Sequence, residues 1–127
     1  MSHFTRMQTQ MVDKAFIVQA LKDLGYQPQV GNVEIRGFGG KRTPVEVKIP
    51  TQNPAFEIGF QKTGSAYELV ADWWGIHEIE PKAFQQQIAQ RYAYHAAIAK
   101  LAEQGFALAG EEQQADGRIH LTLRRIS

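Results

Sequence analysis

The chain has 127 residues, near the common size of one domain, and its 43% hydrophobic and 21% charged residues are ordinary for a globular protein. Fourteen Lys and Arg residues stand against thirteen Asp and Glu residues, and this net charge of +1 argues against nucleic-acid and membrane partners. The chain contains no Cys, which excludes disulfides, thiolate catalysis and Cys-based zinc sites within it.

The first half of the chain combines strand patterns with one helix pattern. Residues 1–11 have an extended pattern without a helix cap. Asp13 can accept hydrogen bonds from the backbone two or three residues on, so it predicts the start of a helix that Gly25 ends. Alternating apolar residues then predict strands around 33–36 and 45–49, joined by the turn "RGFGGKRTP".

The second half repeats this mixture. Alternation predicts strands at 56–60 and 66–74, which form a hairpin around "KTGS". A long helix is predicted over 81–104, because a Pro suits its first turn and a Gly follows its end. Strands at 106–108 and 119–123 enclose the turn "ADG".

These patterns predict one α+β domain over residues 1–127, with two helices against a mainly antiparallel sheet. The expected order is strand, helix, strands, helix, hairpin. One order of elements occurs twice: a helix end, a Gly with an aromatic residue, a strand, a turn and a second strand. Two related halves would explain this echo, and so would the common way in which helices end before strands.

Motifs that carry chemistry are weak in this chain. "RGFGGKRT" lacks the spacing of a phosphate-binding loop and is better read as a hairpin loop. No serine lies in a nucleophile elbow, and "HEIE" at residues 77–80 is a poor metal site. The other histidines, His3, His95 and His120, show no recognised ligand spacing. We therefore predict no catalytic residue, no metal and no cofactor.

The long helix carries an unusual polar pair in its apolar stripe. Arg91 and His95 lie between Phe84, Ile88 and Ile98 at three- and four-residue steps. A buried Arg needs a carboxylate, and Asp72 is our first choice of partner, with Glu57 and Glu68 as alternatives. A structural role for the pair is favoured over a functional pocket.

Two adjacent tryptophans end the strand "AYELVADWW". Successive residues of a regular strand point to opposite faces, so Trp73 or Trp74 is expected to be exposed. Together with the polar pair and nearby aromatic residues, this predicts one candidate binding surface: His3, Phe4, Asp72, Trp73, Trp74, Arg91, Tyr92, Tyr94 and His95.

Several segments resemble one known family. They are "MSHFTRMQTQ", "IRGFGG", "FEIGFQKTGSAYELVADWW", "QQIAQRYAYHAAIAKLAEQGF" and "DGRIHLTLRR". The family is known as hypothetical chloroplast reading frame thirty-five and occurs in cyanobacteria and algal plastid genomes. The resemblance implies a photosynthetic lineage and a cytoplasmic or stromal location, but no activity, substrate or cofactor. Its most specific pieces are Ser2-His3-Phe4, Tyr92-Ala93-Tyr94 and Gly105-Phe106.

Three hypotheses of function remain from the sequence. We favour a small soluble accessory or binding protein that is not catalytic and acts through protein partners. The alternative is a binding protein or enzyme for a small anionic molecule, with Arg91 as the anion anchor and His95 as acid and base. A purely structural subunit or homodimer is the third.

Overall fold

The computed structural model describes residues 3–126 in two compact units, Met1–Tyr92 and Ala93–Ser127. Residues 1 and 2, part of the predicted first strand, lie outside the described residues. The α+β class with a mainly antiparallel sheet is confirmed, and so is the predicted order of elements. The prediction that residues 1–127 fold as one domain stays a prediction.

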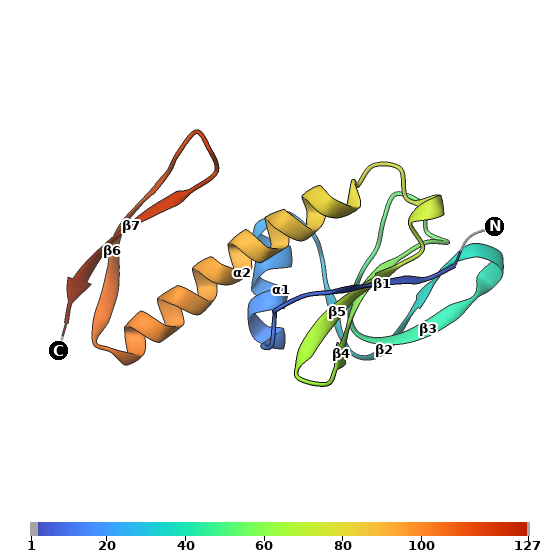
Figure 1. Ribbon diagram of the computed structural model, residues 1–127, viewed down its shortest axis with the longest axis horizontal. Helices are drawn as coiled ribbons and strands as arrows, with labels where there is room; N and C mark the ends of the chain where they lie inside the picture. Colours follow the sequence, from blue (N-terminus) through green and yellow to red (C-terminus); the bar gives the residue numbers. More distant parts are fainter. Residues whose placement is uncertain (1–2, 127) are drawn as a thin grey trace. The chain divides into compact units, whose positions relative to one another are not determined.

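The first unit contains a five-stranded antiparallel sheet in the order β1-β5-β4-β3-β2. Its strands are β1 (Thr5–Gln8), β2 (Gln29–Arg36), β3 (Arg42–Ile49), β4 (Ile58–Thr63) and β5 (Ala66–Ala71). Figure 1 shows β1, dark blue, beside β5, although most of the unit separates them in sequence.

Helix α1 (Lys14–Asp23) begins and ends where its sequence predicts. The Asp13 carboxylate accepts a hydrogen bond from the backbone N–H of Ala15 at 3.0 Å, which satisfies one of the helix's unpaired donors. Gly25 follows the helix with φ of 89°, a left-handed conformation that costs a glycine little.

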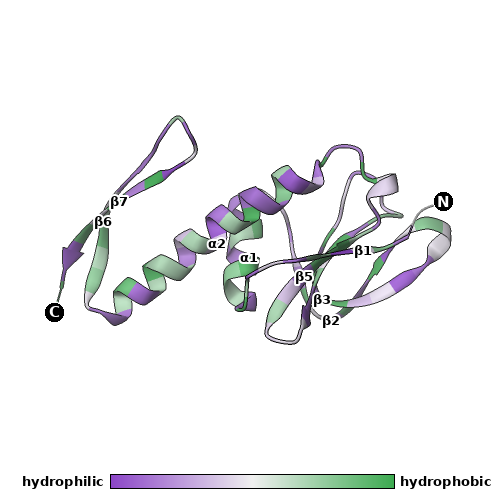
Figure 2. Ribbon diagram, viewed as in Figure 1, coloured by the Kyte–Doolittle hydropathy of each residue, from purple (hydrophilic) through white to green (hydrophobic). Residues whose placement is uncertain are grey.

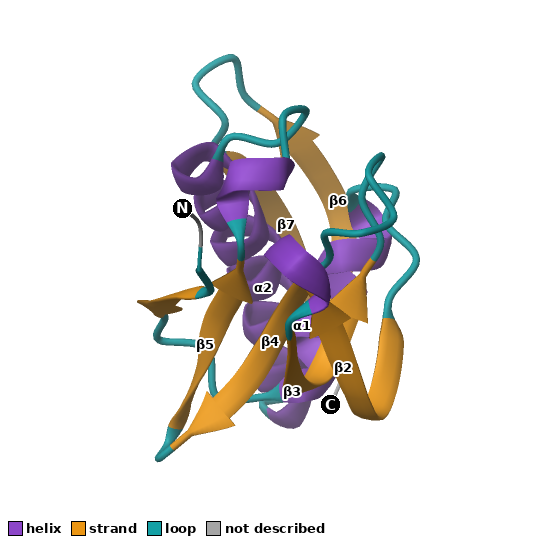
Figure 3. Ribbon diagram, turned by 90° about the vertical axis from the view of Figure 1, so that its right-hand side faces the viewer, coloured by secondary structure: helices purple, strands orange, loops and turns teal. Residues whose placement is uncertain are grey.

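Both helices cover the same face of the sheet. Ile17 and Leu21 of α1, and Phe84 and Ile88 of α2 (Pro81–Glu103), are buried in one cluster with strand residues. The strand residues include Val47, Ile49, Ile58, Phe60 and Leu69. Figure 3 shows α1 behind the orange strands, and Figure 2 shows hydrophobic and hydrophilic segments alternating along α2.

Residues of β2, β3 and β5 form a second buried layer on the opposite face of the sheet. Val70 points away from the helices and is buried in a second, smaller cluster with Ile35 and Val45. Gly59, which pairs with Val70, makes room, because a Cβ there would lie 2.7 Å from Cγ1 of Val45. The sheet therefore has a buried apolar layer on both faces at this point.

The second unit holds the end of α2 and a two-stranded hairpin, β6 (Phe106–Gln113) and β7 (Ile119–Arg125). Within it, the Tyr94 hydroxyl donates to the Glu111 carboxylate at 2.6 Å. Each α-helix is followed by a glycine and an antiparallel hairpin, so the predicted echo is present in the order of elements. Among the described residues, neither helix has the length and apolarity needed to span a membrane.

Candidate binding surface

A buried carboxylate joins two loops at one end of the first unit. Asp72 follows β5 and is only 2% exposed. One of its oxygens accepts from the backbone N–H of Trp74 at 3.3 Å, and the other accepts from the backbone N–H of Phe38 at 3.0 Å. Phe38 lies at the tip of the β2–β3 hairpin, so Asp72 ties this tip to the end of β5.

Asp72 also ends the strand that we predicted to run to residue 74. The strand stops at Ala71, and Trp73–Gly75 form a 3₁₀ turn whose N-cap is Asp72. An Asp side chain that bonds to the backbone two residues on competes with strand pairing and favours a turn. The prediction of a strand through Trp74 is therefore wrong at its end.

The turn brings three aromatic rings together. Trp74 is 61% exposed, and its ring meets that of Phe38, itself 42% exposed, edge to face with centroids 5.2 Å apart. The buried ring of Phe56 lies 6.0 Å from Trp74. We call Phe38, Phe56 and Trp74 the aromatic tip. The exposed tryptophan was expected, but a turn and not strand alternation exposes it.

Two glycines allow the loops to approach this closely. A Cβ at Gly75 would lie 2.3 Å from the ring of Phe56, and a Cβ at Gly37 would lie 2.9 Å from Cε1 of Phe4. Real Cβ atoms do not make such contacts, so larger residues would push the loops apart. Phe4, a predicted surface residue, therefore lies next to the base of the tip and is half-buried.

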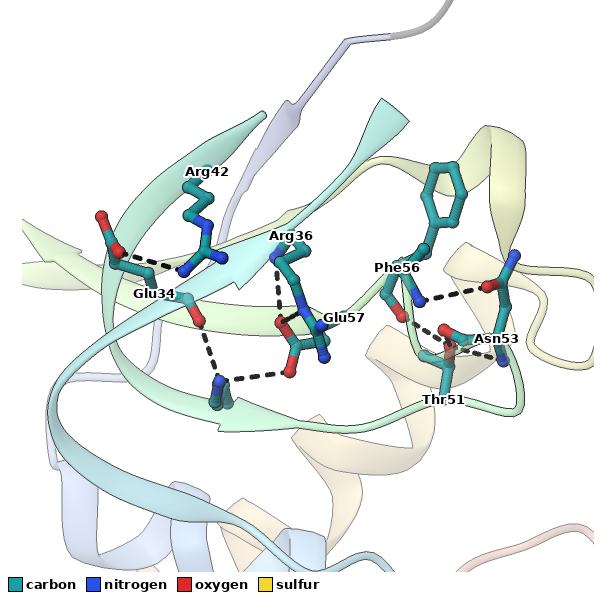
Figure 4. A network of polar contacts seen from close by, with 9 residues as sticks. Glu34, Arg36, Arg42, Thr51, Asn53, Phe56 and Glu57 are labelled. Atoms are coloured by element: carbon teal, nitrogen blue, oxygen red, sulfur yellow. Dashed lines mark hydrogen bonds and ion pairs between the residues drawn. The ribbon is translucent and has the colours of Figure 1, made fainter. Parts of the chain in front are cut away.

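A polar network holds the base of the hairpin in place, as Figure 4 shows. Glu57 is 5% exposed; one oxygen accepts from the backbone and guanidinium of Arg36, and the other from the Lys48 ammonium at 3.1 Å. Burial raises the pKa of Glu57, but the bonds from Arg36 and Lys48 outweigh it and hold the pKa below its ordinary value. The carboxylate is therefore ionised at neutral pH.

The predicted pairing of Arg91 with Asp72 is wrong. Nε of Arg91 lies 2.9 Å from the Asp23 carboxylate at the end of α1. The two alternative carboxylates also have other partners. Glu57 pairs with Arg36 and Lys48. Glu68 lies 3.5 Å from the Arg6 guanidinium. Arg91 thus connects the two helices and does not reach the sheet carboxylates that we considered.

Tyr92 also connects the helices. Its hydroxyl oxygen accepts from the backbone N–H groups of Val12 and Asp13, both at 3.0 Å, beside the start of α1. Its ring packs edge-on against Phe16 with centroids 5.7 Å apart. These contacts favour an architectural role for this residue.

The remaining predicted residues lie in different surroundings. Trp73 is half-buried and packs on the main core, with its ring 6.4 Å from that of Phe84. His3 is exposed near the start of the described residues. Tyr94 and His95 belong to the second unit and contact each other edge to face at 5.1 Å. The structure thus gathers Phe4, Asp72 and Trp74 from the predicted set.

Sequence reasoning missed Phe38 and Phe56. Phe38 lies in "RGFGGKRT", which we read only as a hairpin loop, although binding residues often lie on loops and an aromatic residue there could have been counted as a candidate. Phe56 was read only as part of a strand, and it contacts Trp74 across the loops. Its role depends on long-range contact, which the local pattern does not contain.

The weak metal motif at residues 77–80 has other roles. Glu78 accepts from the backbone N–H of Gln52 at 2.7 Å, and Glu80 accepts from the backbone N–H of Ala83 at 2.6 Å, at the start of α2. Across residues 3–126 there is no group of three or more His, Asp or Glu residues that could hold a metal ion.

Comparison with known proteins gives one consistent result. The family model described as "Protein of unknown function (DUF1257)" matches residues 20–122. The chain is 34% identical to the proteins named "Uncharacterized protein ycf35" of Cyanophora paradoxa, Guillardia theta and Pyropia yezoensis. Each match covers 98% of both chains. No solved structure matches the chain.

Proposed function

Because the chain belongs to the ycf35 family of uncharacterised proteins from photosynthetic lineages, we propose a function from its own surface. The protein is a non-catalytic accessory protein that binds a partner protein through the aromatic tip. The observation that carries this proposal is the exposure of Trp74 and Phe38 in one edge-to-face pair. The expected compartment is the cytoplasm or the plastid stroma.

The properties of the tip are those of a protein-binding hot spot. Tryptophan is enriched among the residues that contribute most to binding, and clustered exposed aromatics mark interaction sites. The backbone of both loops is held by Asp72, so little conformational entropy is lost when a partner orders the rings. A hydrophobic contact of this kind needs no reacting group.

The enzyme hypothesis receives less support. It requires Arg91 as an anchor for an anionic ligand, and this guanidinium is already 2.9 Å from a carboxylate of the protein. A ligand anion would have to compete with Asp23 for the same cation. The geometry therefore favours the tip over the polar pair of α2 as the functional surface.

Site-specific photo-crosslinking tests the proposal. A benzophenone side chain is placed at residue 74, and at Val12 as a matched control, because Val12 is also an exposed apolar residue of the first unit. In a lysate of Cyanophora paradoxa, we expect a discrete protein adduct from residue 74 and not from residue 12. Identical adducts from both positions would show that the tip has no special role.

A further inference from the structure

We infer that the segment bound by the aromatic tip is an acidic peptide, which places an apolar side chain on Trp74 and its carboxylates on Lys41 and Arg42. This inference rests on the proposed function and names the chemistry of the partner. Its basis is a pair of exposed cations, Lys41 and Arg42, at the end of the loop that carries Phe38.

The hairpin tip carries an excess of positive charge. Residues 36–42 contain three cations, Arg36, Lys41 and Arg42, and no carboxylate. Of the carboxylates near this loop, Glu34 lies 3.9 Å from Arg42, and Glu57 and Asp72 are buried. The buried Glu57 is matched by Arg36 and Lys48. Lys41 is exposed and forms no ion pair within residues 3–126, so its ammonium faces solvent.

Arg42 is only weakly matched within the fold. Its guanidinium lies 3.9 Å from Glu34, and both side chains are more than half exposed, a type of pair that contributes little to stability. Arg42 also lies directly opposite Arg36 in the strand register. Like charges opposite each other in a sheet are unfavourable, and a carboxylate of a ligand would relieve this repulsion.

The backbone at Lys41 is held in place relative to that of Phe38. The backbone N–H of Gly37 donates to the carbonyl of Lys41 at 2.9 Å, and the N–H of Lys41 points to the carbonyl of Phe38 at 3.3 Å. Lys41 therefore lies on the same tight turn as Phe38, whose N–H is bound by Asp72. Apolar anchors with cations at their rim fit a peptide that carries an apolar residue among carboxylates.

Single-stranded nucleic acid is the competing ligand for aromatic rings near cations, and the geometry disfavours it. Bases stack on aromatic faces that follow a basic groove. The planes of Phe38 and Trp74 stand at 85° to each other, so the pair does not offer two parallel platforms. The two exposed cations of this loop, Lys41 and Arg42, would also neutralise few phosphates.

Peptide display tests the inference on the full chain. Random peptides are selected on the immobilised wild-type protein, on Trp74→Ala, and on a variant with Lys41→Glu and Arg42→Glu. We expect acidic peptides with an aromatic or aliphatic residue on the wild type, loss of enrichment on Trp74→Ala, and peptides of opposite charge on the charge-reversed variant. Arg118→Glu with Arg124→Glu, two exposed cations of the second unit, is the matched control and should select the same peptides as the wild type.

A synthetic peptide of the enriched sequence then measures how much Lys41 and Arg42 contribute to the affinity. Its dissociation constant should rise about tenfold or more in the charge-reversed variant, equivalent to about 1.4 kcal/mol. Equal thermal unfolding of all variants confirms that each is folded, since every changed side chain is exposed.

The outcomes separate the two proposals. Neutral peptides that depend on Trp74 but not on the two cations would overturn the acidic ligand and leave the tip as the binding surface. Peptides that bind without regard to Trp74 would overturn both. Trp74-dependent binding of oligothymidylate in place of peptides would show a nucleic-acid site and refute the inference.

Discussion

The buried carboxylate of Asp72 is the part of the tip that can be removed with least change in shape. Asp72→Asn keeps the size of the side chain but replaces one acceptor oxygen by an NH₂ group. That oxygen accepts from either Phe38 or Trp74 in the wild type, so one backbone N–H must lose its partner. We expect the loop that loses its bond to become mobile while the strands stay paired.

The expected loss of stability in Asp72→Asn can be worked out from the two hydrogen bonds of Asp72. A hydrogen bond to a charged acceptor contributes about 1.5–3 kcal/mol to stability. Loss of the buried charge, which has no cation among its hydrogen-bond donors, offsets part of this cost. We therefore expect the free energy of unfolding to fall by about 1–2 kcal/mol. For a chain of this length that is a decrease in Tm of roughly 3–10 °C.

Chemical denaturation followed by tryptophan fluorescence measures this change where it occurs, because the chain's two tryptophans, Trp73 and Trp74, both flank the altered loop. Amide hydrogen exchange gives the local readout. We expect the backbone N–H of Phe38 or of Trp74 to exchange faster in Asp72→Asn, whereas amides within β4 keep their protection.

The matched control is Asp116→Asn, which removes a carboxylate that accepts from the backbone of Arg118 in an exposed turn of the second unit. It should change stability by less than about 0.5 kcal/mol. If Asp72→Asn were as stable as the wild type and both amides remained protected, Asp72 would not hold the two loops together and the preformed tip would be refuted.

Three further predictions concern the frame beneath the tip. Gly59→Ala should cost about 1–3 kcal/mol through overpacking, and Val45→Ala in the same chain should recover part of it, as denaturation of the single and double variants would show. Because the pKa of Glu57 is lowered in the folded state, its contribution to stability is present above the ordinary pKa of 4.5 and is lost as the pH falls through the folded-state pKa. The stability of Glu57→Gln should therefore approach that of the wild type in acid. Burial and the neighbouring Glu46 raise the pKa of Tyr67 to about 12, so Tyr67 should contribute a loss of stability of up to about 2–3 kcal/mol between pH 10 and 12, and Tyr67→Phe should show a smaller decrease there, because the pKa of Tyr26 is also raised.

The local features of this fold are well predicted from the sequence, because they depend on neighbouring residues. The side chain of Asp13 reaches the backbone of its own helix, and Gly25 ends that helix without a steric penalty. Alternation also predicts the buried Val47 and Ile49 of β3. In each case the physical cause lies within a few positions of the residue.

The site required long-range contacts and was predicted only in part. The exposed Trp74 was expected, but the strand propensity of "AYELVADWW" hid the turn that Asp72 makes. The partner of Arg91 was sought on the sheet, whereas α1 brings Asp23 to it from 68 positions away. Sequence spacing alone cannot choose among carboxylates that are distant along the chain.

Three features next to the aromatic tip or within it are uncommon in a loop with a purely structural role. The first is a buried carboxylate at Asp72 whose hydrogen bonds come from backbone N–H groups, the second is the opposed pair Arg36 and Arg42, and the third is an exposed Trp74. Residues chosen for stability alone would place unlike charges across the strands and would bury a ring as large as that of Trp74. Natural proteins concentrate such departures where a surface has to act. Their coincidence at one end of the sheet is therefore the strongest reason to look for the partner there, and not along the polar pair of α2.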